Sequence, residues 1–367
     1  MKDQDRNDRE SMEEIQAETT VSKNQTEQKQ HKRRVRYKGT HPRSYQEKYK
    51  ELQPEKYPET IEKVIQKGGT PVGMHISICV KEILDFLQIQ PGQKGLDATL
   101  GYGGHTKEML KCLQGQGHLY ALDVDPIESV KTKERLEKAG YGEDILTIRQ
   151  MNFADIDQIA REAGPFDFVL ADLGVSSMQI DNPERGFTYK KEGPLDLRLN
   201  PQKGVSAAER LKEVTEEELA GMLWENSDEP YAEEIAATVM EKLRKGEPVE
   251  TTIQLQKAIE EALSFLPERE QKEAVKKSCQ RTFQALRIDV NSEFEVLYAF
   301  MEKLPAALAP GGRVAILTFH SGEDRIVKKA FKELKRAGIY SEIAQDVIRP
   351  SAEECTRNSR ARSTKMR

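Results

Sequence analysis

The chain has 367 residues, of which 37% are hydrophobic and 32% charged, and its formal net charge at pH 7 is −5. The length predicts roughly two domain-sized units, and the charge taken alone argues against a general nucleic-acid-binding protein. No apolar run approaches the roughly 20 residues of a membrane-spanning helix, MKDQDRNDRE at the N-terminus lacks the apolar stretch of a signal peptide, and the four cysteines form no C-x-x-C pair. We therefore expect a cytoplasmic protein with no membrane association and no bound metal.

Positive charge is concentrated near the two ends of the chain. Residues 1–30 are polar without periodicity and are expected to be disordered. Residues 31–50, HKRRVRYKGTHPRSYQEKYK, combine eight cations with three tyrosines and one glutamate, and the final stretch, RNSRARSTKMR, is purely basic. Two interpretations stay open: such segments are typical of contacts to a phosphate backbone, with tyrosines stacking on bases, or they are merely solvated tails.

Strand-like and helix-like segments alternate from about Pro71 onward. Apolar segments at 95–100, 118–125, 145–153 and 166–174 are separated by helical patterns, and this alternation predicts a parallel sheet covered by helices, a Rossmann-like α/β fold. After Asp181 the pattern becomes helical, as in YAEEIAATVMEKLRK, until a strand pattern returns with GGRVAILTFHS. We therefore expect an all-helical domain inserted into the α/β domain. The expected divisions are 1–70 (polar and basic N-terminal extension), 71–181 (first part of the α/β domain), 182–281 (inserted helical domain), 282–349 (second part of the α/β domain) and 350–367 (basic C-terminal tail).

A glycine-rich loop, GYGGHT, follows the first predicted strand and opens a helix. Such a loop lets a ligand approach the backbone and offers it the amides of a helix N-terminus. Asp123 and Asp125 end the next strand roughly 20 residues later, where a ribose diol needs an acceptor. A nicotinamide dinucleotide would need a third glycine where the chain has Thr106, so the pattern disfavours an oxidoreductase and favours a cofactor without phosphate, such as S-adenosylmethionine. The alternative stays open that the glycine loop is a structural turn and that the two aspartates end a strand without binding a ligand.

Six motifs in one order resemble a known family. They are DATLGYGGHT, ALDVDP, DLGVSSMQIDNPERGF, GPLDLRLN, RTFQALRIDVN and TFHSGEDRIVK, and from about His75 to the C-terminus the chain is similar to the bacterial RsmH (MraW) methyltransferases. The resemblance implies a class I S-adenosylmethionine methyltransferase fold with an inserted helical domain. It implies methylation of the exocyclic N4 amine of a cytosine in the decoding centre of 16S ribosomal RNA, with the small ribosomal subunit as partner. It also implies cofactor contacts at Gly103, Gly104, His105, Asp123, Phe153, Asp172 and Gln179.

The chemistry of such a reaction directs attention to carboxylates beside the cofactor. The lone pair of a cytosine amine is delocalised into the ring, and an acceptor for its protons helps to localise it as the methyl group arrives. Asp172, at the end of a predicted strand, is the first candidate and Asp196 in GPLDLRLN the second, although an aspartate in such a loop is equally a turn or cap residue. A base that leaves its stack needs stacking surfaces and cations. The candidates for RNA contact are Arg185, Phe187, Tyr189, Arg281, Phe283, Arg287, His320 and Arg325.

Several positions depart from the pattern of the family. KSCQ stands before RTFQALRI in place of His-Pro-Ala-Thr, Met178 in place of proline, Gly322 in place of leucine, and Tyr102 in place of arginine. Because several of these changes fall on the expected RNA side, two alternatives stay open: a paralogue that methylates a different RNA nucleotide, and an RNA-binding ribosome-assembly factor that retains the cofactor fold. The sequence predicts no oligomeric state.

Overall fold

A computed structural model describes residues 77–367, all of which belong to one compact unit of the chain, Tyr49–Arg367. The predicted disordered segment 1–30, the basic segment 31–50 and the rest of the N-terminal extension lie outside the described residues. Within the described part, no helix is both long enough and apolar enough to cross a membrane.

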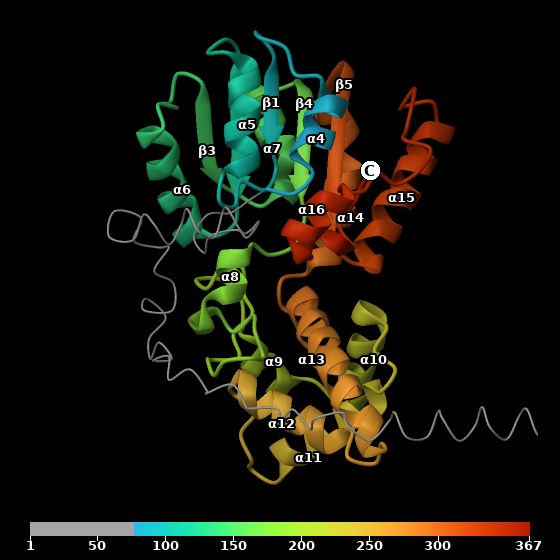
Figure 1. Ribbon diagram of the computed structural model, residues 1–367. Helices are drawn as coiled ribbons and strands as arrows, with labels where there is room; N and C mark the ends of the chain where they lie inside the picture. Colours follow the sequence, from blue (N-terminus) through green and yellow to red (C-terminus); the bar gives the residue numbers. More distant parts are fainter. Residues whose placement is uncertain (1–76) are drawn as a thin grey trace, which may run out of the picture. The chain divides into compact units, whose positions relative to one another are not determined.

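Six strands form one sheet in the order β3-β2-β1-β4-β5-β6 (Figure 1). The sheet is parallel from β1 to β5, as the sequence predicted, and β6 pairs antiparallel with β5. The apolar run FDFVLAD explains the inner place of β4, because a strand covered on both faces needs apolar residues at successive positions. The strands are β1 (Lys94–Asp97), β2 (His118–Asp123), β3 (Leu146–Gln150), β4 (Phe166–Asp172), β5 (Leu308–Thr318) and β6 (Lys365–Met366).

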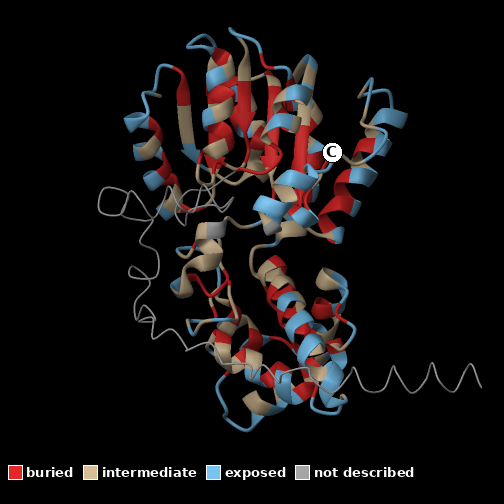
Figure 2. Ribbon diagram, in the orientation of Figure 1, coloured by how far each residue is buried: buried red, intermediate tan, exposed pale blue. Residues whose placement is uncertain are grey.

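Helices cover both faces of this sheet. One layer holds α4 (Val80–Leu87), α5 (Gly104–Leu113) and α6 (Pro126–Lys138), and the other holds α7 (Ile156–Ala163), α14 (Glu293–Ala307) and α15 (Ser321–Arg336). Side chains alternate along β4, so that Phe168 and Leu170 pack in the first layer, and Val169 and Ala171 in the second. The inner strands are therefore buried between flanking helices (Figure 2).

A helical insertion separates β4 from the last part of the sheet, as predicted. Its helices are α9 (Ala207–Glu213), α10 (Glu216–Ser227), α11 (Ala232–Arg244), α12 (Thr252–Ala262) and α13 (Glu268–Val290). Capping boxes at Ser206, Thr215 and Thr251 begin three of them, because each side chain accepts the N–H of a residue three positions later. The helices bury a core of their own, which extends along the chain from Phe187 to Leu286.

The long helix α13 runs across residue 281, where we expected the insertion to end. The helix continues because Phe283 and Leu286 belong to the core of the insertion. It ends at Val290, and α14 begins at Glu293. α13 therefore joins the insertion to the sheet, and the division into separate domains stays a prediction.

The basic end of the chain is folded, which corrects the expectation of a tail at 350–367. It contains α16 (Ala352–Arg357), a 3-10 helix (Ser359–Ser363) and β6. Met366 is fully buried, and its neighbours Lys365 and Arg367 bind the carboxylate of Asp324 at 2.9 and 2.6 Å. The buried methionine and the paired charges fix this end of the chain against the sheet.

Candidate functional site

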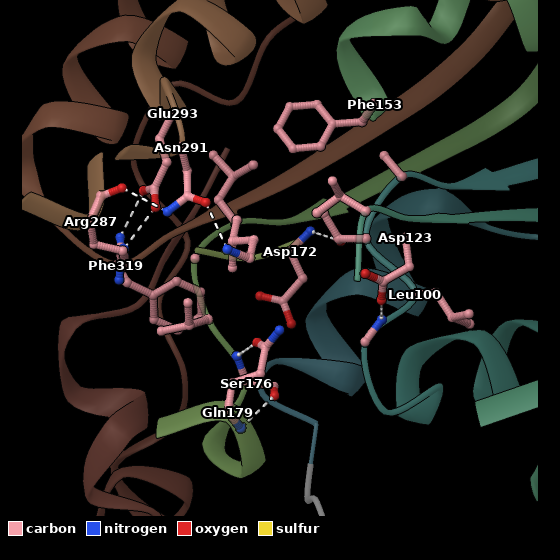
Figure 3. A pocket seen from close by; sticks show the side chains of 18 of the residues that line it. Leu100, Asp123, Phe153, Asp172, Ser176, Gln179, Arg287, Asn291, Glu293 and Phe319 are labelled. Carbon is pink, nitrogen blue, oxygen red and sulfur yellow. Dashed lines mark hydrogen bonds and ion pairs between the residues drawn. The ribbon is translucent and has the colours of Figure 1, made fainter. Parts of the chain in front are cut away.

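A cavity of about 580 Å³ opens at the carboxyl ends of β1, β2 and β4 (Figure 3). Open parallel sheets bind ligands at this edge. The walls come from the strand ends, the glycine loop, the segment after β4 and the junction between α13 and α14. The volume lies in the range of small-molecule and cofactor sites.

The glycine loop has backbone conformations that glycine adopts more readily than other residues. Gly101 and Gly103 have φ angles of +48° and +79°, and a Cβ on Gly103 would lie 2.7 Å from Cγ2 of Thr132 on α6. Gly103 thus packs against α6 and does not line the cavity, whereas Gly104 and His105, at the start of α5, do. The close approach of the loop to α6 brings the first turn of α5 to the cavity.

Asp123 ends β2 and presents its carboxylate to the cavity (Figure 3). Its Oδ2 accepts the backbone N–H of Gly101 at 2.9 Å, and its Oδ1 accepts that of Asp125 at 2.8 Å. Burial raises the pKa of Asp123 to about 7, although the two backbone hydrogen bonds oppose the rise. Each oxygen keeps a lone pair, so the carboxylate can accept the two hydroxyl groups of a ribose.

Phe153 gives the cavity an aromatic wall. It begins a 3-10 helix (Phe153–Asp155) just after β3 and lines the cavity. Its ring meets that of Phe300 on α14 edge-on, with 5.2 Å between the ring centroids. This contact holds the ring in place, and a fixed aromatic face near a ribose acceptor suits an adenine ring.

Asp172, the last residue of β4, has an unsatisfied carboxylate oxygen. Its backbone N–H donates to Oγ1 of Thr99 at 2.6 Å, but its Oδ1 is buried without a hydrogen-bond partner among the described residues. Burial raises the pKa of Asp172 to about 6, against the lowering effect of His105. A buried acceptor without a donor calls for an explanation, and its place in the cavity indicates a donor on a ligand.

The ring of His105 lies beside the same carboxylate. Its Nε2 is 2.9 Å from the carbonyl oxygen of Ile78, and because a carbonyl oxygen only accepts, this nitrogen carries a hydrogen. Its Nδ1 then faces Oδ2 of Asp172 at 3.4 Å. A proton on Asp172 can therefore be shared between Oδ2 and Nδ1.

Gln179, Arg185 and Asp125 tie the cavity to the segment that enters the insertion. Gln179 completes a capping box with Ser176 at the start of α8 (Ser177–Asp181), and its Nε2 donates to Oδ2 of Asp125 at 2.9 Å. Arg185 donates to the same oxygen at 2.8 Å. Gln179 lines the cavity with its amide already engaged, so its contacts in this structure hold the loop in place.

Charged groups from α13, α14 and α15 form another wall. Arg287 donates to both carboxylate oxygens of Glu293 at 2.8 Å, and Nε2 of His320 lies 3.2 Å from Glu323. One possible ligand atom from each of Glu293, His320 and Glu323 lies within 4.8 Å of the others, a spacing that a metal ion could occupy. Since Arg287 engages both oxygens of Glu293, the charge of Glu293 is already balanced without an ion. The expectation of no bound metal stays a prediction.

Asp196 lies outside the cavity, which corrects its candidacy as a catalytic residue. Its two oxygens accept hydrogen bonds from the guanidinium of Arg198 at 2.8 and 2.7 Å. Burial alone would raise the pKa of Asp196, but these hydrogen bonds outweigh it and lower the pKa. Arg185, expected at the RNA, is also corrected: it is buried and donates to Asp125 and to two backbone carbonyl oxygens.

The three aromatic residues expected to stack on RNA belong to the insertion. Phe187 and Phe283 are buried in its core, and they are therefore corrected to core residues. Tyr189 is partly buried and meets Phe283 with 6.0 Å between ring centroids. None of the three lines the cavity.

The remaining expected RNA contacts are three arginines and a histidine. Arg287 and His320 line the cavity, whereas Arg281 and Arg325 do not. Arg325 on α15 is exposed and lies 3.7 Å from Asp228, just after α10. The structure thus brings two of the four to the cavity wall.

Sequence reasoning missed several polar residues of the cavity, including Asn200, Gln284 and Asn291. Asn291 fixes the segment before Asn200, because its side chain accepts from the N–H of Leu199 at 2.7 Å and donates to the carbonyl of Leu197 at 2.8 Å. No spacing rule connects these positions. The motifs GPLDLRLN and RTFQALRIDVN contain all three residues, however, and their place in these motifs was the sequence signal that could have indicated them.

A glycine loop, a ribose acceptor and an aromatic wall at the carboxyl edge of a parallel sheet define an α/β protein of the class that binds adenosyl cofactors. Residues 73–367 match the model of the MraW methylase family, and the chain belongs to that family. The family resemblance found in the six motifs is thereby confirmed, and with it a methyltransferase that uses S-adenosylmethionine.

Relatives extend over most of the chain. It is 70% identical over 337 residues to the ribosomal RNA small subunit methyltransferase H 1 of Lachnoclostridium phytofermentans, with 92% of each chain covered. It is 68% identical over 342 residues to the protein of the same name from Agathobacter rectalis, covering 93% of this chain and 98% of that one. The ribosomal RNA small subunit methyltransferase H of Koribacter versatilis is 38% identical over 298 residues, covering 80% of this chain and 92% of that one.

Proposed function

We propose that this protein transfers a methyl group from S-adenosylmethionine to the exocyclic N4 amine of a cytosine in 16S ribosomal RNA, in the cytoplasm where the small ribosomal subunit is found. The observation that carries the proposal is the buried, unpartnered Oδ1 of Asp172 in a cavity that also contains Asp123 and Phe153. The names of the relatives, small-subunit ribosomal RNA methyltransferases, support the choice of substrate.

The residues of the cavity fit the cofactor. Asp123 keeps two lone pairs for the ribose hydroxyls, Phe153 offers a fixed ring to the adenine, and Gly104 and His105 present the first turn of α5 to the methionine end. Bound there, S-adenosylmethionine supplies a methyl group that its sulfonium has already activated. The protein then has to align the incoming amine and exclude water.

Asp172 takes the proton that the amine loses. As the N–C bond forms and the S–C bond breaks, the nitrogen carries a surplus proton, and Oδ1 has no competing donor among the described residues. A hydrogen bond from the amine to Oδ1 before transfer also localises the lone pair on nitrogen. With its pKa raised to about 6, Asp172 is mostly ionised at neutral pH. The other oxygen of this carboxylate, Oδ2, lies 3.4 Å from Nδ1 of His105.

The base enters beside the junction of α13 and α14. Enzymes that modify a base take it out of its stack, and a pocket must replace the contacts that the base gives up. Arg287, Asn291 and Glu293 line this side of the cavity with donors and acceptors (Figure 3). Because Arg287 and Glu293 hold each other in two hydrogen bonds, this wall is organised before the base arrives.

A different target nucleotide is the second candidate function. Gly322 stands where the family has leucine, and a Cβ there would lie 2.6 Å from the ring of Phe294 and 3.2 Å from Nδ1 of His320. The ring of Phe294 thus occupies the space that a side chain at position 322 would need. This space lies next to His320, which lines the cavity. This altered wall offers a physical route to a shifted base preference.

The test uses small ribosomal subunits from cells that lack the gene. The subunits are incubated with the purified protein and methyl-labelled S-adenosylmethionine, and the RNA is digested and mapped by mass spectrometry. Label on a decoding-centre cytosine supports the proposal, and label elsewhere supports the second candidate. Absence of label, with cofactor binding demonstrated by calorimetry, supports a ribosome-assembly factor instead.

A further inference from the structure

We propose that one face of α15 binds the phosphate backbone of the substrate RNA and guides it to the cavity. The inference rests on the proposed function, because it takes RNA as the substrate. It concerns an exposed surface that the reaction itself does not require. The face consists of Arg325, Lys328, Lys329, Lys332, Lys335 and Arg336, called the basic face of α15 below.

Helix geometry places these six cations together. At about 100° per residue they fall within an arc of roughly 120° around the helix axis. All six residues are exposed, whereas Ile326, Val327 and Phe331 are buried against the sheet layer. The helix therefore buries its apolar side and presents a row of positively charged side chains to solvent.

The charges of this row are mostly unneutralised. Arg325 lies 3.7 Å from Asp228, and the other five cations form no ion pair within the described residues. Exposed lysines on other helices often pair with a glutamate one turn away, as Lys131 does with Glu128 at 3.0 Å.

Nearby acidic side chains of the same helix do not cancel the row. Glu323 and Asp324, in its first turn, are buried. Asp324 is already bound to Lys365 and Arg367. The exposed Glu333 lies at the border of the arc rather than within it. In a chain with a net charge of −5, such a concentration of cations marks a site for an anionic partner.

The position of the row identifies that partner as the RNA. α15 follows directly on His320, which lines the cavity, and Arg325 lies one turn into the helix. From Arg325 to Arg336 the row extends about 16 Å away from this end. A row of cations that starts near a base-binding cavity and leads outward matches a nucleic-acid backbone whose target base is in the cavity.

The experiment compares two triple variants of the full chain. Lys328→Gln, Lys329→Gln and Lys332→Gln together remove three charges from the basic face. The matched control combines Lys107→Gln, Lys138→Gln and Arg149→Gln, which removes three charges at exposed positions on α5, α6 and β3. Arg149 on β3 lies at the opposite end of the sheet order from β5 and β6, and none of the three control residues lies on α15 or lines the cavity.

Binding of small ribosomal subunits that lack the modification is measured over a range of salt concentrations, together with methyl-transfer kinetics and S-adenosylhomocysteine affinity. For the basic-face variant we expect about tenfold weaker RNA binding, a correspondingly higher KM, and a salt slope smaller by about 2. Its kcat and its affinity for S-adenosylhomocysteine should match those of the unmodified protein. The control variant should bind RNA as the unmodified protein does.

Equal RNA binding by the basic-face variant and the unmodified protein would overturn the inference, as would an equal loss in both variants. The proposed function fails by a different result, namely that the unmodified protein transfers no methyl group to RNA. The binding measurement does not depend on transfer, so it decides the role of the basic face in either case.

Discussion

Replacing Asp172 by asparagine should separate cofactor binding from methyl transfer. The variant keeps the size of the side chain and one oxygen that accepts a hydrogen bond, but an amide does not take a proton at neutral pH. Oδ1 has no hydrogen-bond partner among the described residues, so the exchange breaks no contact that this oxygen makes in the structure.

The magnitude follows from the role of the carboxylate. A positioned general base contributes about 10² to 10⁴ in rate, or about 3 to 5 kcal/mol of activation free energy. Because burial raises the pKa of Asp172 to about 6, the unmodified protein should lose about tenfold in rate between pH 7 and pH 5, as the carboxylate becomes protonated. The residual rate of Asp172→Asn should lack this dependence.

Single-turnover transfer of a labelled methyl group, measured from pH 5 to pH 8, gives both quantities. Calorimetric binding of S-adenosylhomocysteine shows whether the site is intact, and Asp196→Asn makes the same chemical change outside the cavity as a control. A rate for Asp172→Asn within tenfold of the unmodified protein, with the same pH profile, would exclude Asp172 as the proton acceptor.

Three further predictions concern the cofactor and stability. Asp123 must be ionised to accept two hydroxyl groups, and burial raises its pKa to about 7, so the dissociation constant of S-adenosylhomocysteine should rise about tenfold from pH 8 to pH 6. Calorimetry checks this, and a constant value over that range would exclude the role. Asp172→Asn should also stabilise the fold, because the raised pKa means that the ionised carboxylate lowers the free energy of unfolding. This cost is absent below about pH 3.9, the pKa of the unfolded state, and reaches its full size above about pH 6. The pKa shift from 3.8 to about 6 limits the gain in the free energy of unfolding to roughly 3 kcal/mol. We therefore expect a Tm higher by a few degrees at pH 8 and unchanged near pH 3. An unchanged Tm at pH 8 in scanning calorimetry would contradict this prediction. Arg185→Ala should destabilise by about 3 to 5 kcal/mol, because the buried carboxylate of Asp125 loses its cation. In urea unfolding the exposed Arg161→Ala should cost about 0.5 kcal/mol or less, and equal losses in these two variants would be inconsistent with the buried pair.

The cofactor side could be predicted because its signals are local in the sequence. Gly103 is needed where the backbone has a positive φ and touches Thr132, and Asp123 follows at the end of the next parallel strand. In a parallel sheet, successive strand ends meet at one edge. A short pattern therefore carries information about a site assembled in three dimensions.

The RNA side could not be predicted in the same way because composition does not distinguish surface from core. Arg185 pairs with Asp125 from 60 residues earlier, and Phe187 is buried in the insertion. The end of the chain likewise pairs with Asp324, 41 and 43 residues away. Long-range partners neutralise cations that look free in the sequence.

The basic face of α15 illustrates the opposite case. Its six cations are scattered through GEDRIVKKAFKELKR and do not form a block. They align only once the helix from Ser321 to Arg336 is known. The family motif covers the start of this segment, and the spacing of the cations after it becomes meaningful only on a helix.

The chemical identity of the methylated nucleoside tests the proposed activity most directly. Ribosomal RNA from subunits that lack the modification is methylated by the purified protein with deuterium-labelled S-adenosylmethionine, digested to nucleosides and analysed by mass spectrometry. We expect labelled N4-methylcytidine, reduced at least about hundredfold when Asp172→Asn replaces the unmodified protein. Label on the cytosine ring carbon, on a ribose hydroxyl or on another base would contradict it.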